Sequence, residues 1–291
     1  MESFEAAGAN TLSTEQLAAW IGRTESRSDV VTAWPAVALT ATLDRHDPAP
    51  KRGDALPPGW HWLYFLEAAP ASELGRDGHP KRGGFLPPVA LPRRMWAGGR
   101  LEFRRPLRVG EEVRRDSAIV SIAPKHGRSG NLVFVTVRHS VHADGELAVI
   151  EDHDIVYREA AKPGDAPPPA KPAPRAAPWR REIVADPVML FRYSALTFIG
   201  QRIHYDFEYC RNVEGYPGLV VHGPLQVILL LDLARRHEPR AVKRLEYRAL
   251  HPLFHFERFS LNGQPAADGS QAELWTANPA GNYAMSATAY F

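Results

Sequence analysis

Cysteine is almost absent from this sequence, which contains a single one, Cys210, in 291 residues. One cysteine cannot form a disulfide within the chain, so we expect a reducing compartment and a fold held by its core. Apolar runs of about 20 residues, the length that a membrane-spanning helix needs, are also absent. The first residues, Met1–Glu5, are acidic and do not resemble a secretory signal. These absences predict a soluble cytoplasmic protein without a membrane partner.

A strong net charge is lacking as well, since the formal charge is +2 at pH 7. A nearly neutral chain has no electrostatic footprint for a polyanion, so nucleic acid is not an expected partner. The sequence also has no Cys/His cluster at metal-ligand spacing, no glycine-rich loop that follows a strand and opens a helix, and no serine nucleophile elbow. We therefore expect no metal site and no nucleotide-binding loop.

Hydrophobic residues are plentiful, at 44% of the chain, which is enough for a sizeable core in one large or two ordinary domains. The clearest boundary is the segment Ala160–Pro178, which is rich in proline, alanine and lysine. Such a composition is typical of a semi-rigid extended linker that cannot pack a core. We predict a non-catalytic N-terminal domain over residues 1–160, a linker over 161–180 and a C-terminal catalytic domain over 181–291.

The two domains share one order of elements. An apolar run that follows proline and glycine, Leu56–Leu66 in the first half and Leu225–Ala234 in the second, predicts a long buried helix in each. Strand-like runs follow each helix: Arg100–Pro106, Val113–Ile122, Leu132–His142 and Ala148–Arg158, then Val242–Ala249, Phe254–Leu261, Gln271–Thr276 and Tyr283–Phe291. A helix wrapped by an antiparallel sheet is a hot-dog fold, so the order predicts an α+β double hot dog.

Turn residues separate these runs. Ala143–Glu146 suits a tight hairpin, and Asn262–Gly263 and Ala267–Gly269 are further hairpin signals. The stretch Glu73–Pro92 is rich in glycine, proline and charge and predicts a long loop, and loops of this length inside a domain are often functional. Lys125–Gly130 is a basic loop.

Chemistry-bearing residues concentrate just before the second helix. Arg202–Asp206 is a polar, titratable cluster, and Gly215–Pro224 is a glycine-rich turn that leads into the apolar run. Pro224 suits the first helical turn, whose backbone N–H groups have no partner within the helix and can polarise a carbonyl. His204 is the candidate acid/base group, because imidazole titrates near pH 7. The Gly223 N–H is the candidate oxyanion donor.

Six segments together form a recognisable set: Pro57–Phe65, Lys81–Pro88, Arg94–Gly99, Phe191–Phe198, Arg202–Asp206 and Gly215–Pro224. They resemble the MaoC-like double hot-dog (R)-hydratase/dehydratase family with a dehydratase-like N-terminal domain. The likeness extends from about Leu56 to the last residue, and it is strongest to the mesaconyl-C4-CoA hydratase and itaconyl-CoA hydratase branch. It implies an acyl-CoA hydratase that adds water across the α,β double bond, with citramalyl-CoA as the product. It also implies no cofactor beyond the coenzyme A of the substrate.

The resemblance also assigns His204 to the catalytic histidine of the family. An acidic or amide residue is expected five positions before it, but that position is Ile199. Three positions before it, where a polar residue is expected, is Gln201, which could hold the water by its amide or be a surface residue. The histidine is thus present without its usual partner, so either another group positions the water or the activity is altered.

The sequence allows two roles for each of several neighbours of His204. Asp206 either orients the imidazole or caps a helix, and Arg202 either contacts the substrate or pairs with Asp206. His222 either lines the site or is a satisfied histidine at the helix start. Tyr205 is a further candidate for substrate binding.

Basic side chains are expected to hold the coenzyme A phosphates or a free carboxylate of the substrate. Lys81, Arg82 and Arg94 are the candidates from the long loop of the first half. The expected assembly is a monomer or a homodimer. Two other functions remain open: a hot-dog acyl-CoA thioesterase, which would release free thiol, and a catalytically degenerate acyl-CoA-binding protein, which would bind without turnover.

Overall fold

A computed structural model describes residues 14–127, 130–159 and 170–291. The helices are α1 Thr14–Ala18, α2 Ala33–Thr42, α3 Pro187–Thr197, α4 Phe207–Asn212 and α5 Gly223–His237, with short 3-10 helices η1 Trp60–Leu63, η2 Ala71–Glu73 and η3 Arg202–His204. The strands are β1 Thr24–Val30, β2 Arg93–Phe103, β3 Glu112–Gly127, β4 Gly130–Ala143, β5 Glu146–Arg158, β6 Trp179–Val184, β7 Arg244–Ala249, β8 Arg258–Pro265, β9 Gln271–Ala277 and β10 Tyr283–Tyr290.

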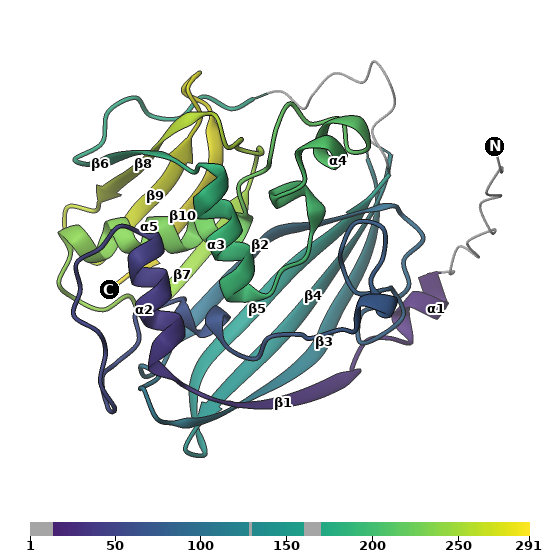
Figure 1. Cartoon of the computed structure of the whole chain (residues 1–291), viewed down its shortest axis with the longest axis horizontal. Coiled ribbons are helices and arrows are strands. Elements are labelled where there is room, and N and C mark those ends of the chain that lie inside the picture. The colour runs from purple at the N-terminus through teal and green to yellow at the C-terminus, as the bar shows by residue number, and fades with distance from the viewer. Residues whose placement is uncertain (1–13, 128–129, 160–169) are drawn as a thin grey trace.

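All ten strands form one sheet, in the order β1-β3-β4-β5-β2-β7-β10-β9-β8-β6 (Figure 1). The first five come from the first half of the chain and the last five from the second half. Each half has the same internal order, and the halves meet where equivalent strands β2 and β7 pair antiparallel, with Gly99 opposite Tyr247. This is the α+β double hot dog that the order of elements predicts.

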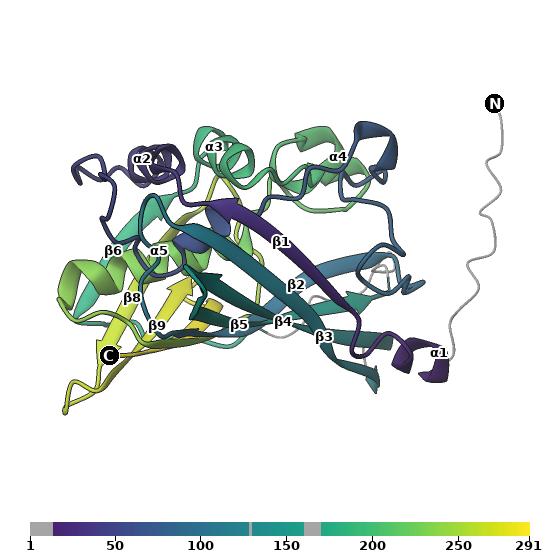
Figure 2. The same ribbon diagram turned by 90° about the horizontal axis from the view of Figure 1, so that it is seen from below.

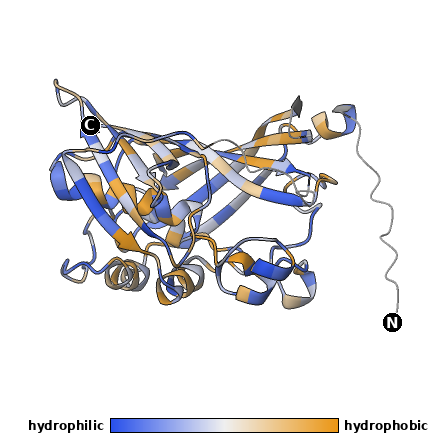
Figure 3. Ribbon diagram, turned by 90° about the horizontal axis from the view of Figure 1, so that it is seen from above, coloured by the Kyte–Doolittle hydropathy of each residue, from blue (hydrophilic) through white to orange (hydrophobic). Residues whose placement is uncertain are grey.

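Helices cover one side of the sheet. Figure 2 shows α2, α3 and α4 in one layer, with α5 between this layer and the strands of the second half. Orange and blue segments alternate along the strands in Figure 3, as expected of a sheet whose two faces differ.

The second half has the predicted long helix. In α5, Pro224 lies in the first turn and every residue from Leu225 to Ala234 is buried. Asp232 is buried too, and its carboxylate accepts from Arg45 at 2.5 Å and from Arg236 at 2.8 Å. Because a buried charge needs a partner, these ion pairs fix the last turns of α5.

The first half lacks its predicted long helix, and here the prediction was wrong. Only one turn, η1, forms within Leu56–Leu66. Pro57, Pro58 and Gly59 precede it, and Phe65 ends it with a left-handed φ of 59°. The Phe65 N–H donates to the Asp29 carboxylate at 2.7 Å instead of continuing a helix. Burial of this run is therefore achieved by a turn, not by a helix.

Two other expectations fail. Asn262–Gly263 is not a hairpin turn but lies inside β8, because the fully buried Asn262 side chain donates to Ser260 Oγ at 2.9 Å. The predicted linker also packs at its end: Ala173 is buried against Trp275, and β6 begins at Trp179. Residues 160–169, which include the first part of the predicted linker, lie outside the described residues, as do Arg128 and Ser129 of the basic loop.

The remaining elements are close to expectation. The hairpin at Ala143–Glu146 forms, with Asp144 and Gly145 both at positive φ. Helix α2 lies between β1 and the turn η1. No helix among residues 14–127, 130–159 and 170–291 is long and apolar enough to cross a membrane.

Candidate active site

The site lies where helix α3, the turn η3 and helix α4 follow one another with short breaks between them. Helix α3 ends at Phe198, whose φ of 51° turns the chain sharply. After Ile199 and Gly200, the single turn η3 carries His204, and α4 begins only after Asp206. The interruption leaves His204 at a fixed bend rather than on a helix face.

His204 is buried and neutral. Its Nδ1 lies 2.7 Å from the Val220 carbonyl oxygen. A carbonyl can only accept, so Nδ1 carries the proton and Nε2 carries a lone pair. Burial lowers the pKa of His204 to about 4. The ring therefore presents an unprotonated Nε2 at pH 7, and this nitrogen has no partner among the described residues.

His222 packs directly against that ring. The two imidazole centroids lie 3.6 Å apart with an interplanar angle of 19°. His222 Nε2 is 2.8 Å from Ser194 Oγ, and burial lowers the pKa of His222 well below its usual value. Only 1% of His222 is exposed, and its Nδ1 is buried without a hydrogen-bond partner in the described chain. The ring therefore packs under His204, but it is only partly satisfied as a helix-start histidine.

Gly223 begins α5 immediately after His222. Within the described chain its N–H has no hydrogen-bond acceptor, as expected at the first turn of a helix. The Trp96 ring closes this position from the first half: a Cβ added at Gly223 would lie 2.3 Å from Trp96 Cε3. Trp96 is held in turn by Tyr247, 4.8 Å away between ring centroids. The helix N-terminus thus faces an aromatic wall with a free donor.

We expect Gly223→Ala to reduce both stability and activity. Its Cβ would push against a Trp96 ring that neighbouring aromatics hold in place, at a cost of about 1–3 kcal/mol for overpacking. The shift would also misplace the N–H donor. Thermal unfolding and kcat measure the two effects. Gly84→Ala is the matched control, because a Cβ there meets nothing within 4 Å, and an equal response in both variants would contradict the prediction.

Most of the polar residues near His204 form hydrogen bonds with neighbouring residues. Asp206 caps α4 by accepting from the Tyr209 N–H at 2.9 Å and pairs with Arg202 at 2.6 Å. Hydrogen bonds from Tyr209 and Arg202 lower the pKa of Asp206. The Tyr205 hydroxyl donates to the Gly200 carbonyl at 3.0 Å. These contacts favour a helix-capping role for Asp206 and an ion pair with Asp206 for Arg202. Gln201 is half-buried, and its side chain makes no hydrogen bond within the described chain.

The three basic candidates, Lys81, Arg82 and Arg94, differ in the partners that their charged groups already have. Lys81 is exposed and donates to the Ser72 carbonyl at 2.9 Å. Arg82 donates to the carbonyls of Val89, Leu91 and Pro92, so its guanidinium holds its own loop closed. Arg94 is the second residue of β2 and is half-buried, and its side chain is hydrogen-bonded to Tyr157. Within the described ranges Arg94 is therefore the one of the three that is bonded neither to its own loop nor to a carboxylate.

The long loop of the first half reaches the His204 segment, which the sequence did not predict. The Arg202 N–H donates to the Asp77 carbonyl at 2.9 Å. His79 Nδ1 lies 3.0 Å from Asp77 Oδ2. The sequence marked this loop as functional through its length and composition, but no local pattern singled out Asp77 or His79.

A second buried polar cluster was also missed. Glu151 on β5 is 5% exposed. It accepts from Trp62 Nε1 at 3.0 Å and lies 3.1 Å from His61 Nε2. His139 and His153 lie half-buried near it, and loss of solvent contact lowers their pKa values. The turn η1 thus places His61 and Trp62 over a polar patch of the sheet.

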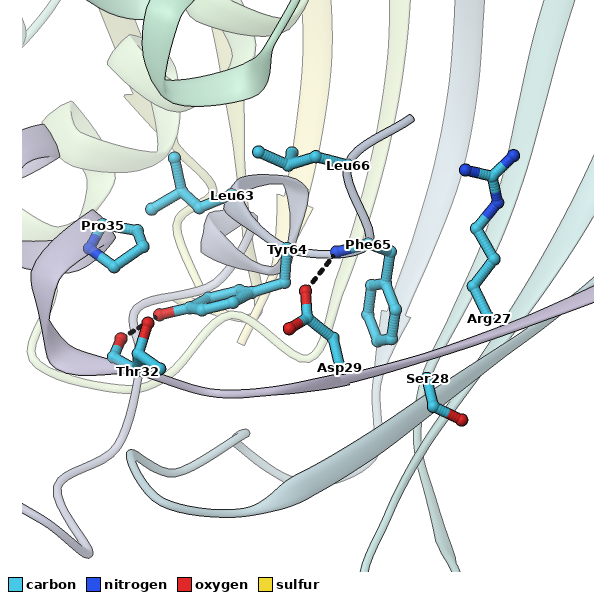
Figure 4. A pocket seen from close by; sticks show the side chains of 9 residues that line it. All are labelled: Arg27, Ser28, Asp29, Thr32, Pro35, Leu63, Tyr64, Phe65 and Leu66. Atoms are coloured by element: carbon cyan, nitrogen blue, oxygen red, sulfur yellow. Dashed lines mark hydrogen bonds between the residues drawn. The ribbon is translucent and has the colours of Figure 1, made fainter. Parts of the chain in front are cut away.

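A groove elsewhere in the first half is separate from His204. It lies between β1, the start of α2 and the segment after η1, and Figure 4 shows its lining residues. Its polar groups are already paired: the Tyr64 hydroxyl donates to the Thr32 carbonyl at 2.6 Å, and Asp29 accepts from Phe65. No further acid/base group is offered by this lining.

Fold and site together define a double hot-dog protein with one histidine-centred site at the start of a buried helix. The family model described as hydroxyacyl-thioester dehydratase type 2 matches residues 59–255. A mesaconyl-C(4)-CoA hydratase from Chloroflexus aurantiacus is 47% identical over 277 residues, which cover 95% of this chain and 98% of the relative. The chain therefore belongs to the hydroxyacyl-thioester dehydratase type 2 family and is a hydro-lyase.

More distant relatives agree. The mitochondrial hydroxyacyl-thioester dehydratase type 2 of Schizosaccharomyces pombe is 30% identical, over 78% of this chain and 85% of the relative. Among solved structures, HtdX from Mycobacterium tuberculosis has a TM-score of 0.64 at 17% identity, covering 92% of this chain and 98% of the other. A MaoC-like dehydratase from Phytophthora capsici has a TM-score of 0.69 at 12% identity, covering 96% and 98%. The two structures support the fold.

Proposed function

We propose that the chain hydrates the α,β double bond of an enoyl-CoA, with His204 as the base. The observation that carries this is the fixed tautomer of His204: Nδ1 donates to Val220, and Nε2 is left as an acceptor for a water proton. The Gly223 N–H at the start of α5 polarises the thioester carbonyl and holds the enolate oxygen as it forms. The same proton returns from His204 to Cα.

For the substrate we propose a branched dicarboxylic thioester, mesaconyl-C4-CoA or itaconyl-CoA, with citramalyl-CoA as the product. The α,β hydration step applies to mesaconyl-C4-CoA, whose double bond is α,β to the thioester; in itaconyl-CoA the double bond is β,γ to the thioester, so its hydration is followed as citramalyl-CoA formation. The support is the 47% identity to the Chloroflexus hydratase and the position of Arg94. The charge of Arg94 acts on both Asp77 and His79, so this guanidinium lies close to the loop that reaches His204. In mesaconyl-C4-CoA the free carboxylate is attached to the carbon that receives water, so a cation is needed at that end of the site.

The test is the loss of enoyl-thioester absorbance with purified protein on mesaconyl-C4-CoA and crotonyl-CoA, and citramalyl-CoA formation from itaconyl-CoA, with free thiol measured in parallel. Absorbance loss without thiol release supports a hydratase. Thiol release would show a thioesterase instead, and tight binding without turnover would show a degenerate binder.

We expect Arg94→Ala to separate the substrates. Removing a charged hydrogen-bond donor from the free carboxylate costs about 1.5–3 kcal/mol, or roughly 10- to 150-fold in kcat/KM for mesaconyl-C4-CoA. Crotonyl-CoA carries no such carboxylate, so its kcat/KM should change by less than about twofold. Steady-state kinetics on both thioesters gives the comparison. An equal loss on both would mean that Arg94 does not read the carboxylate.

Further parts of the proposal follow from the same chemistry. Residues 181–291 supply the base and the oxyanion donor, residues 1–160 form the partner domain, and 161–180 connect them. Hydration of an enoyl thioester needs no cofactor beyond the coenzyme A of the substrate. The single buried thiol, Cys210, suits a reducing cytoplasm. The assembly is a monomer or a homodimer, since two hot-dog halves already pair within one chain.

A further inference from the structure

The loop between η2 and β2 docks on the segment that carries His204. Besides the bond from the Arg202 N–H to the Asp77 carbonyl at 2.9 Å, Arg202 Nη1 donates to the Arg76 carbonyl at 3.3 Å. Gly78 has a φ of 84°, and a Cβ there would lie 1.9 Å from the Gly200 carbonyl oxygen. Only glycine permits this approach. The first half therefore meets the second half beside Ile199.

Within this loop, Asp77 holds His79 in one orientation. One carboxylate oxygen of Asp77 lies 3.0 Å from His79 Nδ1, and the other accepts from the His79 backbone N–H at 3.1 Å. Burial opposes ionisation of Asp77, but the hydrogen bonds and charge of His79 lower its pKa to about 2. The carboxylate is therefore ionised at pH 7 and fixes the proton on Nδ1. The remaining nitrogen, Nε2, is an acceptor without a partner in the described part of the chain.

His79 and His204 thus have the same tautomer and lie within electrostatic reach. Burial lowers the pKa of His204, and the charge of a protonated His79 would lower it further. Both rings belong to segments that touch at Gly78 and Gly200. Ile199, which lies between α3 and this contact, has no polar group to offer.

We propose that His79, oriented by Asp77, is a second catalytic histidine that holds the attacking water, in place of the polar residue that Ile199 does not supply. This inference rests on the proposed hydratase function. It makes the first half a contributor to the active site.

The chemistry balances with one water molecule. Before attack, one O–H of the water donates to His204 Nε2 and the other donates to His79 Nε2. The water oxygen bonds to Cβ, the electron pair of the double bond moves onto the thioester as an enolate, and His204 takes the first proton. The enolate then collapses, and His204 returns that proton to Cα. The second hydrogen remains on the new hydroxyl, still bonded to His79.

The direct test compares His79→Ala with Glu73→Ala, an exposed position on the same loop, using crotonyl-CoA. We expect His79→Ala to lower kcat at least about tenfold with KM nearly unchanged, because water is held only during the chemical step. Glu73→Ala should match the wild type. Adding Ile199→Asp to His79→Ala should restore part of the lost kcat. An unchanged kcat in His79→Ala would overturn the proposal.

A pH profile separates catalysis from loop support. The charged and titratable groups that act on His79 are Asp77, Arg82, Arg94 and His204. His79 accepts from water only when neutral, so its protonation sets an acid limb in kcat/KM. Burial lowers the pKa of His79, and the hydrogen bond with Asp77 opposes this shift. Asp77→Asn should therefore move this limb to lower pH while kcat falls. A limb that stays in place in this variant would mean that Asp77 and His79 only support the loop.

Nitrogen-15 NMR of the imidazoles gives a readout that does not need turnover. The Nε2 resonances are assigned with His79→Ala and His204→Ala. Addition of crotonyl-CoA to the wild type should shift both resonances together. If no thioester is hydrated but both shift, the hydratase function fails and the shared site stands. If only the His204 resonance shifts, or if neither resonance shifts, His79 and His204 do not share a substrate site.

Discussion

Replacing His204 with alanine is expected to lower kcat by about two to four orders of magnitude, the usual contribution of a positioned acid/base group. The Nε2 of this ring is unprotonated at pH 7, and the ring stacks on His222, the residue that precedes Gly223 at the start of α5. Its Nδ1 is committed to Val220 at 2.7 Å, so no rotation of the ring can exchange the two nitrogens without breaking that bond. Alanine offers neither nitrogen.

The measurement is enoyl-thioester hydration by His204→Ala beside His46→Ala, an exposed histidine whose loss should leave kcat unchanged. Because His204 also stacks on His222, thermal unfolding of each variant must accompany the kinetics. A folded His204→Ala protein that retains more than about a tenth of wild-type kcat would show that another group is the base.

Replacing Glu151 with alanine is expected to have the largest effect on stability, about 3–5 kcal/mol, as when one partner of a buried charged pair is removed. Its carboxylate accepts from Trp62 at 3.0 Å and pairs with His61 at 3.1 Å. Alanine would leave both groups buried without an acceptor. Chemical denaturation measures the change. Glu102→Ala, which breaks the exposed Arg104–Glu102 pair, is the control and should cost at most about 1 kcal/mol.

The same carboxylate predicts the acid stability of the fold. Burial alone would raise the pKa of Glu151, but the hydrogen bond with His61 holds it well below its usual range. A carboxyl with a depressed pKa in the folded state stabilises the fold above the unfolded pKa of about 4.3, and this stability is lost as the pH falls below that value. Wild-type stability should therefore fall more steeply below pH 4.3 than that of Glu151→Gln. Parallel slopes would contradict this assignment.

Local chemistry made much of the architecture predictable. The hairpin at Ala143–Glu146 is specified by residues that adopt positive φ easily, and α5 by Pro224 ahead of a largely apolar run. The same reasoning failed at Asn262–Gly263, where the turn-like pair is overridden by tertiary hydrogen bonds to Asn262. It also failed at Leu56–Leu66, since apolar composition alone does not distinguish a buried helix from a buried turn.

The site residues also fall into those that the sequence singles out and those that only the structure reveals. His204 and Gly223 could be predicted because both lie in one contiguous stretch beside the helix start. Asp77 and Glu151 could not, because each acquires its meaning only when segments distant in sequence meet: Asp77 opposite Arg202, and Glu151 beneath Trp62. A side chain whose partner is supplied by tertiary structure leaves no periodic or spacing signal in the sequence.

The seam between β2 and β7 joins equivalent strands of two similar halves within a single polypeptide. Two identical subunits joined at such a seam would share every substitution, so a change useful in one copy would be imposed on the other. Covalent linkage removes that constraint. One half has kept a fifteen-residue helix in α5, while the corresponding stretch of the other is a four-residue turn. The two halves of a nearly symmetric sheet therefore carry unlike central elements, and each can be changed without changing the other.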